Sequence, residues 1–465
     1  MDDIGARSTE LRALPQVQRL LEHPRAHALG ELHSREQVVA ALRRALDQAR
    51  EALRSGVLLA APNEAELLDQ VEAALAAAAK PVLVPVINAT GVVLHTNLGR
   101  APMPAAALEA VMQVGQGYSN LEFDLAGGVR GSRTQGIEPL LRELMGAEAG
   151  LAVNNAAAAV LLALSALAGG GEVIVSRGEL VEIGGGFRIP DVIRQGGAKL
   201  VEVGTTNRTR LADYANAITP ETRVLLKVHQ SNYRVVGFTA EASLSELSGL
   251  ARERGLVLMH DLGGGAMTDL RRLDRPYEPT ARDSLEAGAD LVAFSGDKLM
   301  GGPQAGLLAG RKAAIDPLRK HPLLRAVRLD KMTLAALEAT LRLYRDPAKA
   351  ATGVPALAML AQSSDTLRAR AERLAAALGG GARVEASTAY TGGGTLPGEA
   401  MASWAVRVAG PEPEALSARL RAQTPAVVGR IDDGALVLDM LTVRDGELDA
   451  LIAALTAALN AAWAG

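Results

Sequence analysis

The sequence predicts an α/β protein whose core is a mostly parallel sheet with helices on both faces, joined to a helical N-terminal domain and a small C-terminal α+β domain. Between residues 86 and 335, short apolar runs alternate with helical or glycine-rich segments, which is typical of a parallel sheet. The chain of 465 residues also exceeds the length at which one hydrophobic core keeps growing. Two or three domains are therefore expected.

The predicted elements follow in order along the chain. Residues 1–75 have helical patterns only and form the first domain, and the alanine-rich and proline-bounded residues 76–85 form a linker. Residues 86–335 form the large domain, with strands at 151–153, 173–175, 200–203, 224–228, 256–259 and 291–294. Residues 336–465 form the small domain, with strands at 403–408 and 435–438 and helices at 365–378 and 445–463.

The composition excludes several classes of protein. The chain has no cysteine, which excludes disulfides and thiolate metal sites, and no metal site is predicted. Its longest apolar stretch, residues 156–168, is too short to cross a bilayer and predicts a buried helix. The acidic start Met1-Asp2-Asp3 is unlike a signal peptide, so a cytoplasmic protein without a membrane partner is expected.

One lysine stands where a cofactor-bearing lysine would be placed. Lys298 follows the predicted strand 291–294 and the turn at Ser295, and it precedes a glycine pair that lets the backbone pass close to a bulky group. Desolvation favours the neutral amine and lowers a lysine pKa by up to about 3–5 units, which a Schiff-base nucleophile requires. A solvated structural lysine is the alternative for this motif taken alone.

An aspartate ends a second apolar run. Asp261 follows residues 256–259 and precedes three glycines, so it stands at a strand end. Ligands of open α/β sheets bind at the carboxyl ends of strands, and Asp261 and Lys298 would share a crevice if their strands are neighbours. Pyridoxal 5′-phosphate needs both groups, a lysine for the Schiff base and a carboxylate for the pyridine nitrogen. An aspartate that caps a turn is the alternative.

The third predicted cofactor element is the junction of a strand and a helix. The strand 151–153 meets Asn154, Asn155 and Ala156 at the start of an alanine-rich helix. Free N–H groups at such a helix start bind phosphate, although either asparagine could equally be only an N-cap. The order of phosphate site, aspartate and lysine is the order of fold-type I pyridoxal phosphate enzymes.

With these residues in view, the chain resembles the bacterial L-seryl-tRNA(Sec) selenium transferases, also called selenocysteine synthases, nearly from end to end. The N-terminal string 11–15 (LRALP) and the region 176–191 belong to the likeness. The longer strings that carry it are 87–100 (INATGVVLHTNLGR), 118–122 (YSNLE), 130–133 (RGSR), 204–209 (GTTNRT), 229–234 (HQSNYR) and 294–306 (FSGDKLMGGPQAG).

The resemblance implies a β-replacement on seryl-tRNA(Sec). The serine would lose water to give an aminoacrylyl-tRNA intermediate and accept selenium from selenophosphate, which yields selenocysteinyl-tRNA(Sec). Lys298 would hold the cofactor and, once released, move the α-proton of the substrate, while Asp261 would keep the ring nitrogen of the cofactor protonated. Asp297 is expected next to the chemistry without an assigned role, and Ser295 is expected among the cofactor-binding residues. His229 and His260 stay open between core side chains and cofactor contacts.

Selenophosphate is a dense anion, so guanidinium groups are expected around it. Arg100, Arg325 and Arg328 match the resemblance as substrate-binding residues. The spacing of the last two places both on one helical face if that segment is helical, and a surface arginine pair on a solvated helix is the alternative.

The charge pattern bears on the tRNA partner. The net charge of −3 lacks the basic character of a nucleic-acid binder, but residues 4–60 hold nine arginines against six acids, a local net charge of +3. Arg43, Arg50 and Arg54 share one helical stripe that could meet an RNA backbone, and a solvated face is the alternative. The resemblance implies that this domain binds the tRNA, and also a homo-oligomer, a ring of five dimers with active sites at dimer interfaces.

Two departures from the family pattern and two rival functions remain at this point. The run Asn154-Asn155 is one asparagine shorter than usual, and Gly263-Gly264-Gly265 replaces a more usual Gly-Ser-Gly. The rivals are a pyridoxal phosphate lyase of a small amino acid or amino sugar acid, and a tRNA-binding protein with a decayed site. The presence of the N-terminal domain argues against the first, and the intact Lys298, Asp261 and arginine set against the second.

Overall fold

The computed structural model describes residues 2–409 and 412–463. The chain divides into two compact units, Met1–Pro85 and Val86–Gly465, each with its own hydrophobic core.

The first unit consists of helices and their connections. A stripe of apolar residues on α4, which includes Val38, Leu42 and Leu46, packs with Leu68 and Val71 of α5. The helices are α1 (Asp2–Ala13), α2 (Val17–Leu21), α3 (Pro24–Leu32), α4 (Arg35–Ser55) and α5 (Glu64–Ala79). Residues 76–79 of the predicted linker 76–85 are the last four residues of α5, because alanines are strong helix formers and continue the helix.

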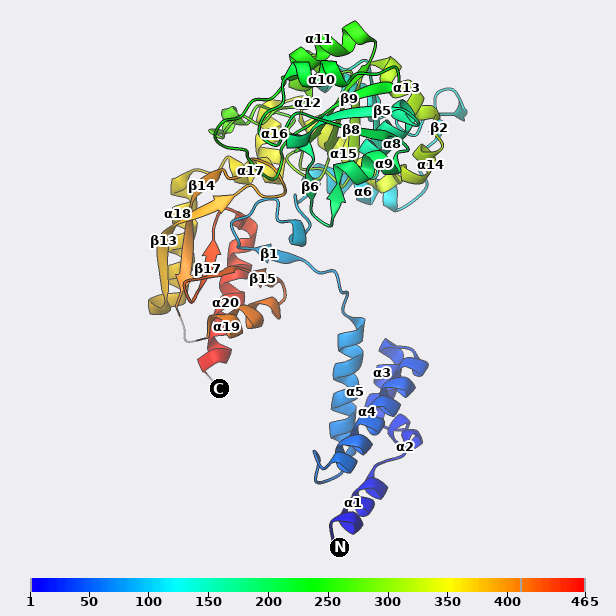
Figure 1. The fold of residues 1–465 in the computed structure, drawn as a ribbon. Coiled ribbons are helices and arrows are strands. Elements are labelled where there is room, and N and C mark those ends of the chain that lie inside the picture. The colour runs from blue at the N-terminus through cyan, green and yellow to red at the C-terminus, as the bar shows by residue number, and fades with distance from the viewer. Residues whose placement is uncertain (1, 410–411, 464–465) are drawn as a thin grey trace. The chain divides into compact units, whose positions relative to one another are not determined.

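The second unit is built on a central sheet, of which Figure 1 labels β9, β5 and β8. The strand order of this sheet is β4-β12-β11-β10-β9-β5-β8. All neighbouring strands are parallel except at β12, which is antiparallel to both of its neighbours. The strands are β4 (Ala149–Val153), β5 (Glu172–Ser176), β8 (Lys199–Val203), β9 (Thr222–Val228), β10 (Val257–Gly263), β11 (Leu291–Ser295) and β12 (Gly306–Gly310). The predicted mostly parallel sheet is confirmed.

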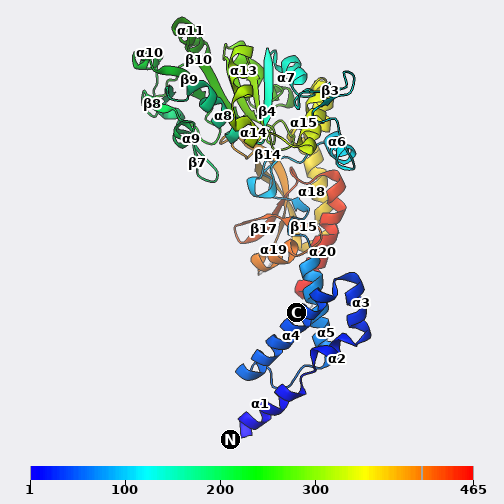
Figure 2. The same cartoon turned by 90° about the vertical axis from the view of Figure 1, so that its right-hand side faces the viewer.

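Helices cover both faces of this sheet because its central strands are apolar on both sides. On β11, Leu291 and Ala293 pack with the cluster of α8, α9, α13 and α14, whereas Val292 and Phe294 pack with the cluster of α7, α10, α11 and α12. The helices of the first cluster are labelled in Figure 2. The first group is α8 (Ala156–Ala168), α9 (Ile189–Gln195), α13 (Lys312–Lys320) and α14 (Leu323–Val327). The second group is α7 (Glu138–Met145), α10 (Leu211–Ala217), α11 (Leu244–Arg254) and α12 (Ala281–Glu286).

Smaller elements connect these layers. The helices are α6 (Ala105–Gly115), α15 (Lys331–Leu343), α16 (Pro347–Gly353) and α17 (Pro355–Leu360), with short 3-10 turns at Thr96–Leu98, Arg177–Glu179 and Leu270–Leu273. Two hairpins are formed by β2 (Phe123–Asp124) with β3 (Val129–Arg130) and by β6 (Glu182–Ile183) with β7 (Phe187–Arg188).

A second, antiparallel sheet has the order β13-β14-β17-β16. Its elements are β13 (Ala382–Tyr390), β14 (Ala400–Val408), β16 (Arg430–Asp432) and β17 (Ala435–Asp439), with α18 (Ser364–Leu378), α19 (Pro413–Arg421) and α20 (Leu448–Trp463) packed nearby and 3-10 turns at Gly379–Gly381 and Asp445–Glu447. The start of the unit, β1 (Val86–Asn88), pairs in parallel with β15 (Ala426–Val428). The predicted boundary between residues 335 and 336 falls inside α15, whose buried leucines continue the core of the first sheet across it.

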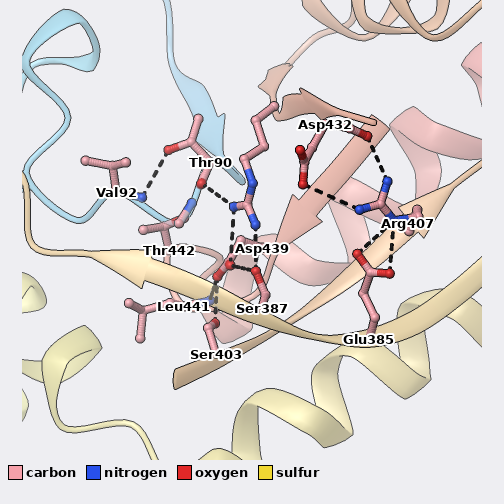
Figure 3. A network of polar contacts seen from close by, with 12 residues as sticks. Thr90, Val92, Glu385, Ser387, Ser403, Arg407, Asp432, Asp439, Leu441 and Thr442 are labelled. Carbon is pink, nitrogen blue, oxygen red and sulfur yellow. Dashed lines mark hydrogen bonds and ion pairs between the residues drawn. The ribbon is translucent and has the colours of Figure 1, made fainter. Parts of the chain in front are cut away.

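A buried carboxylate joins this second sheet to the segment after β1 (Figure 3). Asp439 accepts hydrogen bonds from Ser387 Oγ at 2.6 Å, Ser403 Oγ at 2.7 Å and the Leu441 N–H at 3.0 Å, and Arg430 lies 3.4 Å away. A Cβ atom on Gly91, whose φ is +79°, would lie 2.7 Å from the Asp439 carboxyl carbon. The carboxylate therefore requires a glycine at position 91.

Asp439→Ala is expected to lower the free energy of unfolding by about 3–5 kcal/mol, because it removes the acceptor of a buried charged network. Asp432→Ala is the matched control, since that carboxylate is exposed, lies 3.5 Å from Arg407 in the same sheet, and should change stability by less than about 1 kcal/mol. Urea unfolding of both variants measures the difference. Equal losses in the two variants would contradict the role of the network.

None of the helices in the described part of the chain has the length and apolar character needed to cross a bilayer.

Candidate active site

The predicted aspartate and lysine lie at the same edge of the central sheet. β10 and β11 are neighbouring parallel strands, as the sequence analysis required, and Asp261 is opposite Ala293 in their register. Lys298 follows the last residue of β11, Ser295, by three positions. Both side chains therefore lie at the carboxyl ends of adjacent strands, where α/β sheets bind ligands.

A cavity of about 310 Å³ opens at this edge. It is lined by the predicted residues Arg100, Asn155, Ala156, Asp261, Ser295, Asp297 and Lys298. Its wall also contains Ile183 and Phe187 of the β6–β7 hairpin, together with Gln304, for which the sequence analysis assigned no role. The hairpin lies in the region 176–191 that carries the resemblance, so that string was the only available signal for it.

Two buried lysines of the described chain have opposite electrostatic environments. Burial, together with the positive charge of Arg100, lowers the pKa of Lys298 below its usual value. Burial also acts on Lys227, but the carboxylates of Glu179 at 2.7 Å and Glu241 at 2.9 Å raise its pKa above the usual value. Lys298 is therefore the lysine suited to react as a neutral amine.

Asp261 is a buried carboxylate next to this lysine. Burial raises its pKa to about 6, and the charge of Lys298 and the N–H of Gly263 oppose the rise. No ion pair joins Asp261 to a basic side chain among residues 2–409 and 412–463. A protonated ring nitrogen placed opposite Asp261 would give this carboxylate a cationic partner in direct contact, which the described side chains do not supply.

The start of α8 lines one end of the cavity. Asn155 is the N-cap, and its Oδ1 accepts the Ala158 N–H at 2.8 Å. The N–H groups of Ala156 and Ala157 precede the first intrahelical hydrogen bond and line the cavity, so they can bind a phosphate group. Asn154 is not brought into the cavity, because its side chain is exposed and its N–H donates to Val327.

Asp297 holds Arg100 at the cavity wall. Arg100 Nη1 donates to Asp297 Oδ2 at 2.6 Å, and Ser295 Oγ donates to Asp297 Oδ1 at 2.6 Å. Asp297 is buried and the guanidinium is partly exposed, so the carboxylate fixes a cationic group whose remaining N–H donors can bind an anion. This contact joins residues 197 positions apart.

Arg325 and Arg328 lie elsewhere. Both line a second cavity of about 480 Å³, and Arg328 Nη1 is 3.8 Å from Glu122. The condition for a shared helical face is not met, since α14 ends at Val327 and Arg328 has an extended backbone that forms a bridge with Val153. The second cavity is therefore next to β4, the strand that leads into α8.

The sequence analysis left His229 and His260 undecided between core side chains and cofactor contacts, and the structure shows where both lie. His260 is buried, its Nδ1 lies 2.9 Å from Ser284 Oγ, and burial lowers its pKa to about 3, so it is a neutral core side chain. His229 does not line the Lys298 cavity but lies in a separate cavity of about 440 Å³.

Comparison with known proteins decides the family. A family model described as L-seryl-tRNA selenium transferase matches residues 86–444, and a model described as selenocysteine synthase N terminal matches residues 11–50. The chain belongs to the L-seryl-tRNA selenium transferase family. The L-seryl-tRNA(Sec) selenium transferase of Geobacter sulfurreducens is 52% identical over 95% of this chain and 98% of that protein. The protein of the same name from Hyphomonas neptunium is 51% identical over 96% and 98% of the two chains.

The solved structures agree on the fold. The structure of D-glucosaminate-6-phosphate ammonia-lyase aligns with a TM-score of 0.57 at 23% identity and covers 82% of this chain and 97% of that one. This chain of the selenium transferase family has the fold of the fold-type I pyridoxal phosphate enzymes. The lysine, the buried carboxylate and the helix start around one cavity fit pyridoxal 5′-phosphate as a cofactor.

Proposed function

We propose that this protein converts L-seryl-tRNA(Sec) into L-selenocysteinyl-tRNA(Sec), with selenophosphate as the selenium donor. The observation that carries the proposal is the match to relatives of that name over about 95% of the chain, N-terminal unit included, together with an intact lysine and aspartate cavity. The likeness to an ammonia-lyase is at 23% identity and extends to the fold alone.

The residues of the cavity have distinct roles in this proposal. Pyridoxal phosphate, when bound, withdraws electrons from the α-carbon of an amino acid. Lys298 would hold the cofactor through Nζ, and its neutral amine would remove the α-proton of the substrate. Asp261 holds a proton at the ring nitrogen, and the N–H groups of Ala156 and Ala157 bind the phosphate group.

Arginines supply the site for the selenium donor. Arg100, fixed by Asp297, offers its free N–H groups to the anionic selenophosphate. Arg325 and Arg328 line a different cavity of the same chain, so we infer that they complete the anion site when two copies associate, as expected for a ring of five dimers.

The N-terminal unit provides the surface for the tRNA. Arg43, Arg50 and Arg54 all lie on α4, whose apolar stripe faces the core of the unit. The side chains of Arg43 and Arg54 are exposed and that of Arg50 is half-buried, with Nη1 2.6 Å from Asp47. Phosphate groups of the RNA backbone would meet these guanidinium groups.

The experiment that tests this function compares serylated tRNA(Sec) with free L-serine as substrates, each with selenophosphate. Product is expected from the tRNA-bound serine only. The triple variant Arg43→Ala, Arg50→Ala and Arg54→Ala is expected to bind the tRNA at least about 10-fold more weakly at moderate salt. The slope of log binding constant against log salt concentration should become shallower by the amount that corresponds to the loss of about three phosphate contacts.

The control is a triple variant that also removes three positive charges, but from exposed side chains of the second unit. Its substitutions are Lys312→Ala, Lys349→Ala and Arg373→Ala. This variant should bind tRNA like the wild type. If free serine reacts and the tRNA does not, the protein is a small-molecule enzyme. If the α4 triple variant binds the tRNA as tightly as the control variant does, the arginine stripe on α4 is only a solvated face.

A further inference from the structure

One polar side chain of the Lys298 cavity has no role in the proposed function. From Leu291 to Gly310 every residue is buried except Gln304, which is exposed and lines the cavity. Its carboxamide forms no hydrogen bond with any of residues 2–409 and 412–463. Both N–H donors and the carbonyl acceptor of this side chain are therefore free to bind a ligand.

The backbone fixes the place of Gln304 relative to Lys298. The N–H of Gly296 donates to the carbonyl oxygen of Ala305 at 2.8 Å, which closes a loop that contains both Lys298 and Gln304. A Cβ atom on Gly296 would lie 2.9 Å from the carbonyl oxygen of Pro303, so the two ends of this loop are packed against each other. The lysine and the carboxamide are therefore carried by one closed loop.

The same loop leads to the start of α8. Two residues after Gln304, a Cβ atom on Gly306 would lie 2.9 Å from the backbone nitrogen of Ala156. The chain therefore runs from Lys298 to the helix start, with Gln304 between them. In the proposed function the N–H groups of the helix start bind the phosphate group of the cofactor. The phosphate has donors of its own there, so the carboxamide of Gln304 is available to the substrate.

The charges of the cavity wall distinguish two kinds of substrate. The cationic side chains that line it are Lys298, which holds the cofactor in the proposed function, and Arg100, whose charge is balanced by Asp297 at 2.6 Å. A free amino acid carries a carboxylate, which is bound most strongly by an unpaired guanidinium group. In an aminoacyl-tRNA that carboxyl group is an ester, so its carbonyl oxygen is neutral and is matched by the neutral N–H donors of a carboxamide.

We propose that Gln304 recognises the ester group of seryl-tRNA(Sec), with Nε2 donating a hydrogen bond to the ester carbonyl oxygen. The inference rests on the proposed function, in which the serine enters the Lys298 cavity attached to its tRNA. Gln304 is a specificity-determining residue, because its carboxamide binds the neutral ester and offers no charge to the carboxylate of free serine.

The test compares seryl-tRNA(Sec) with uncharged tRNA(Sec), because only the first presents the ester. Gln304→Glu keeps the shape of the side chain but replaces its N–H donors with a carboxylate oxygen, which repels the ester carbonyl oxygen. It should lower kcat/KM for seryl-tRNA(Sec) at least about 10-fold, and Gln304→Ala should lower it about 3–10-fold, as expected for one neutral hydrogen bond. Equilibrium binding, measured without selenophosphate, should weaken for seryl-tRNA(Sec) and stay unchanged for the uncharged tRNA.

Gln195→Glu is the matched control. Gln195 is the exposed last residue of α9, which leads back to the start of β8 at the opposite edge of the sheet, so this variant should bind and convert seryl-tRNA(Sec) like the wild type. Unchanged kcat/KM in both Gln304 variants would overturn the inference. A weaker affinity for the cofactor, measured by titration of its visible absorbance, would also overturn it, since Gln304 would then bind the phosphate group. A wild type that converts free L-serine but not seryl-tRNA(Sec) would overturn the proposed function itself.

Discussion

Lys298→Ala is expected to lower the formation of selenocysteinyl-tRNA(Sec) by at least about 10⁴-fold and to abolish the visible band of the lysine-bound cofactor. The reason is that, in the proposed function, one side chain both binds the cofactor and transfers the α-proton, so its removal eliminates two functions together. Lys298→Arg should be equally inactive, because a guanidinium keeps the positive charge but cannot act as a neutral amine. Single-turnover assays and absorbance spectra measure both effects.

Lys227→Arg is the matched control for a buried lysine. Its guanidinium can keep the ion pairs with Glu179 and Glu241, so cofactor binding and turnover should stay close to the wild-type values. If Lys298→Ala retains the visible band, another lysine binds the cofactor and the assignment of the cavity is wrong.

Asp261→Asn is expected to have opposite effects on activity and on stability. Turnover should fall by about 10²–10³-fold, because a buried carboxylate opposite a cationic ring nitrogen contributes roughly 3–4 kcal/mol that the neutral amide cannot supply. Cofactor-free Asp261→Asn should be more stable than the cofactor-free wild type at pH 7.5, by about 2–3 kcal/mol.

The sign of the stability effect follows from the pKa of Asp261, which burial raises from 3.8 to about 6. The folded protein therefore binds more protons than the unfolded chain between these values, and its stability falls as pH rises through that window. The loss persists above pH 6, and asparagine removes it. Denaturant unfolding at pH 4 and pH 7.5 should show the difference between variant and wild type only at the higher pH. A variant that is less stable at pH 7.5 would contradict this account.

The sequence contained enough information to place the lysine and the aspartate. Apolar runs followed by turn residues identified the ends of β10 and β11, and parallel strands bring such ends to one edge of a sheet. The alanine-rich helix after β4 and the N-cap position next to it were also readable, because helix starts depend on local residues. The resemblance then supplied the cofactor and the reaction class.

The features that the sequence analysis misplaced are the ends of two helices. The alanines of residues 76–79 favoured a linker next to Pro81 but continue α5, and Arg328 falls one residue outside a helix of five residues. Helix ends shift by a few residues at little energetic expense, so a one-dimensional pattern locates them poorly.

By itself, the sequence determined the fold class, the strand ends that carry Lys298 and Asp261, the helix start at Asn155, and the family. The tertiary structure alone decided which side chains meet across long separations. Asp297 with Arg100, Asp439 with Ser387, and Lys227 with Glu179 are contacts between segments that are distant in the chain. The physical reason is that periodicity and turn chemistry are properties of neighbouring residues, whereas burial, desolvation and the resulting pKa values depend on the order in which the strands assemble.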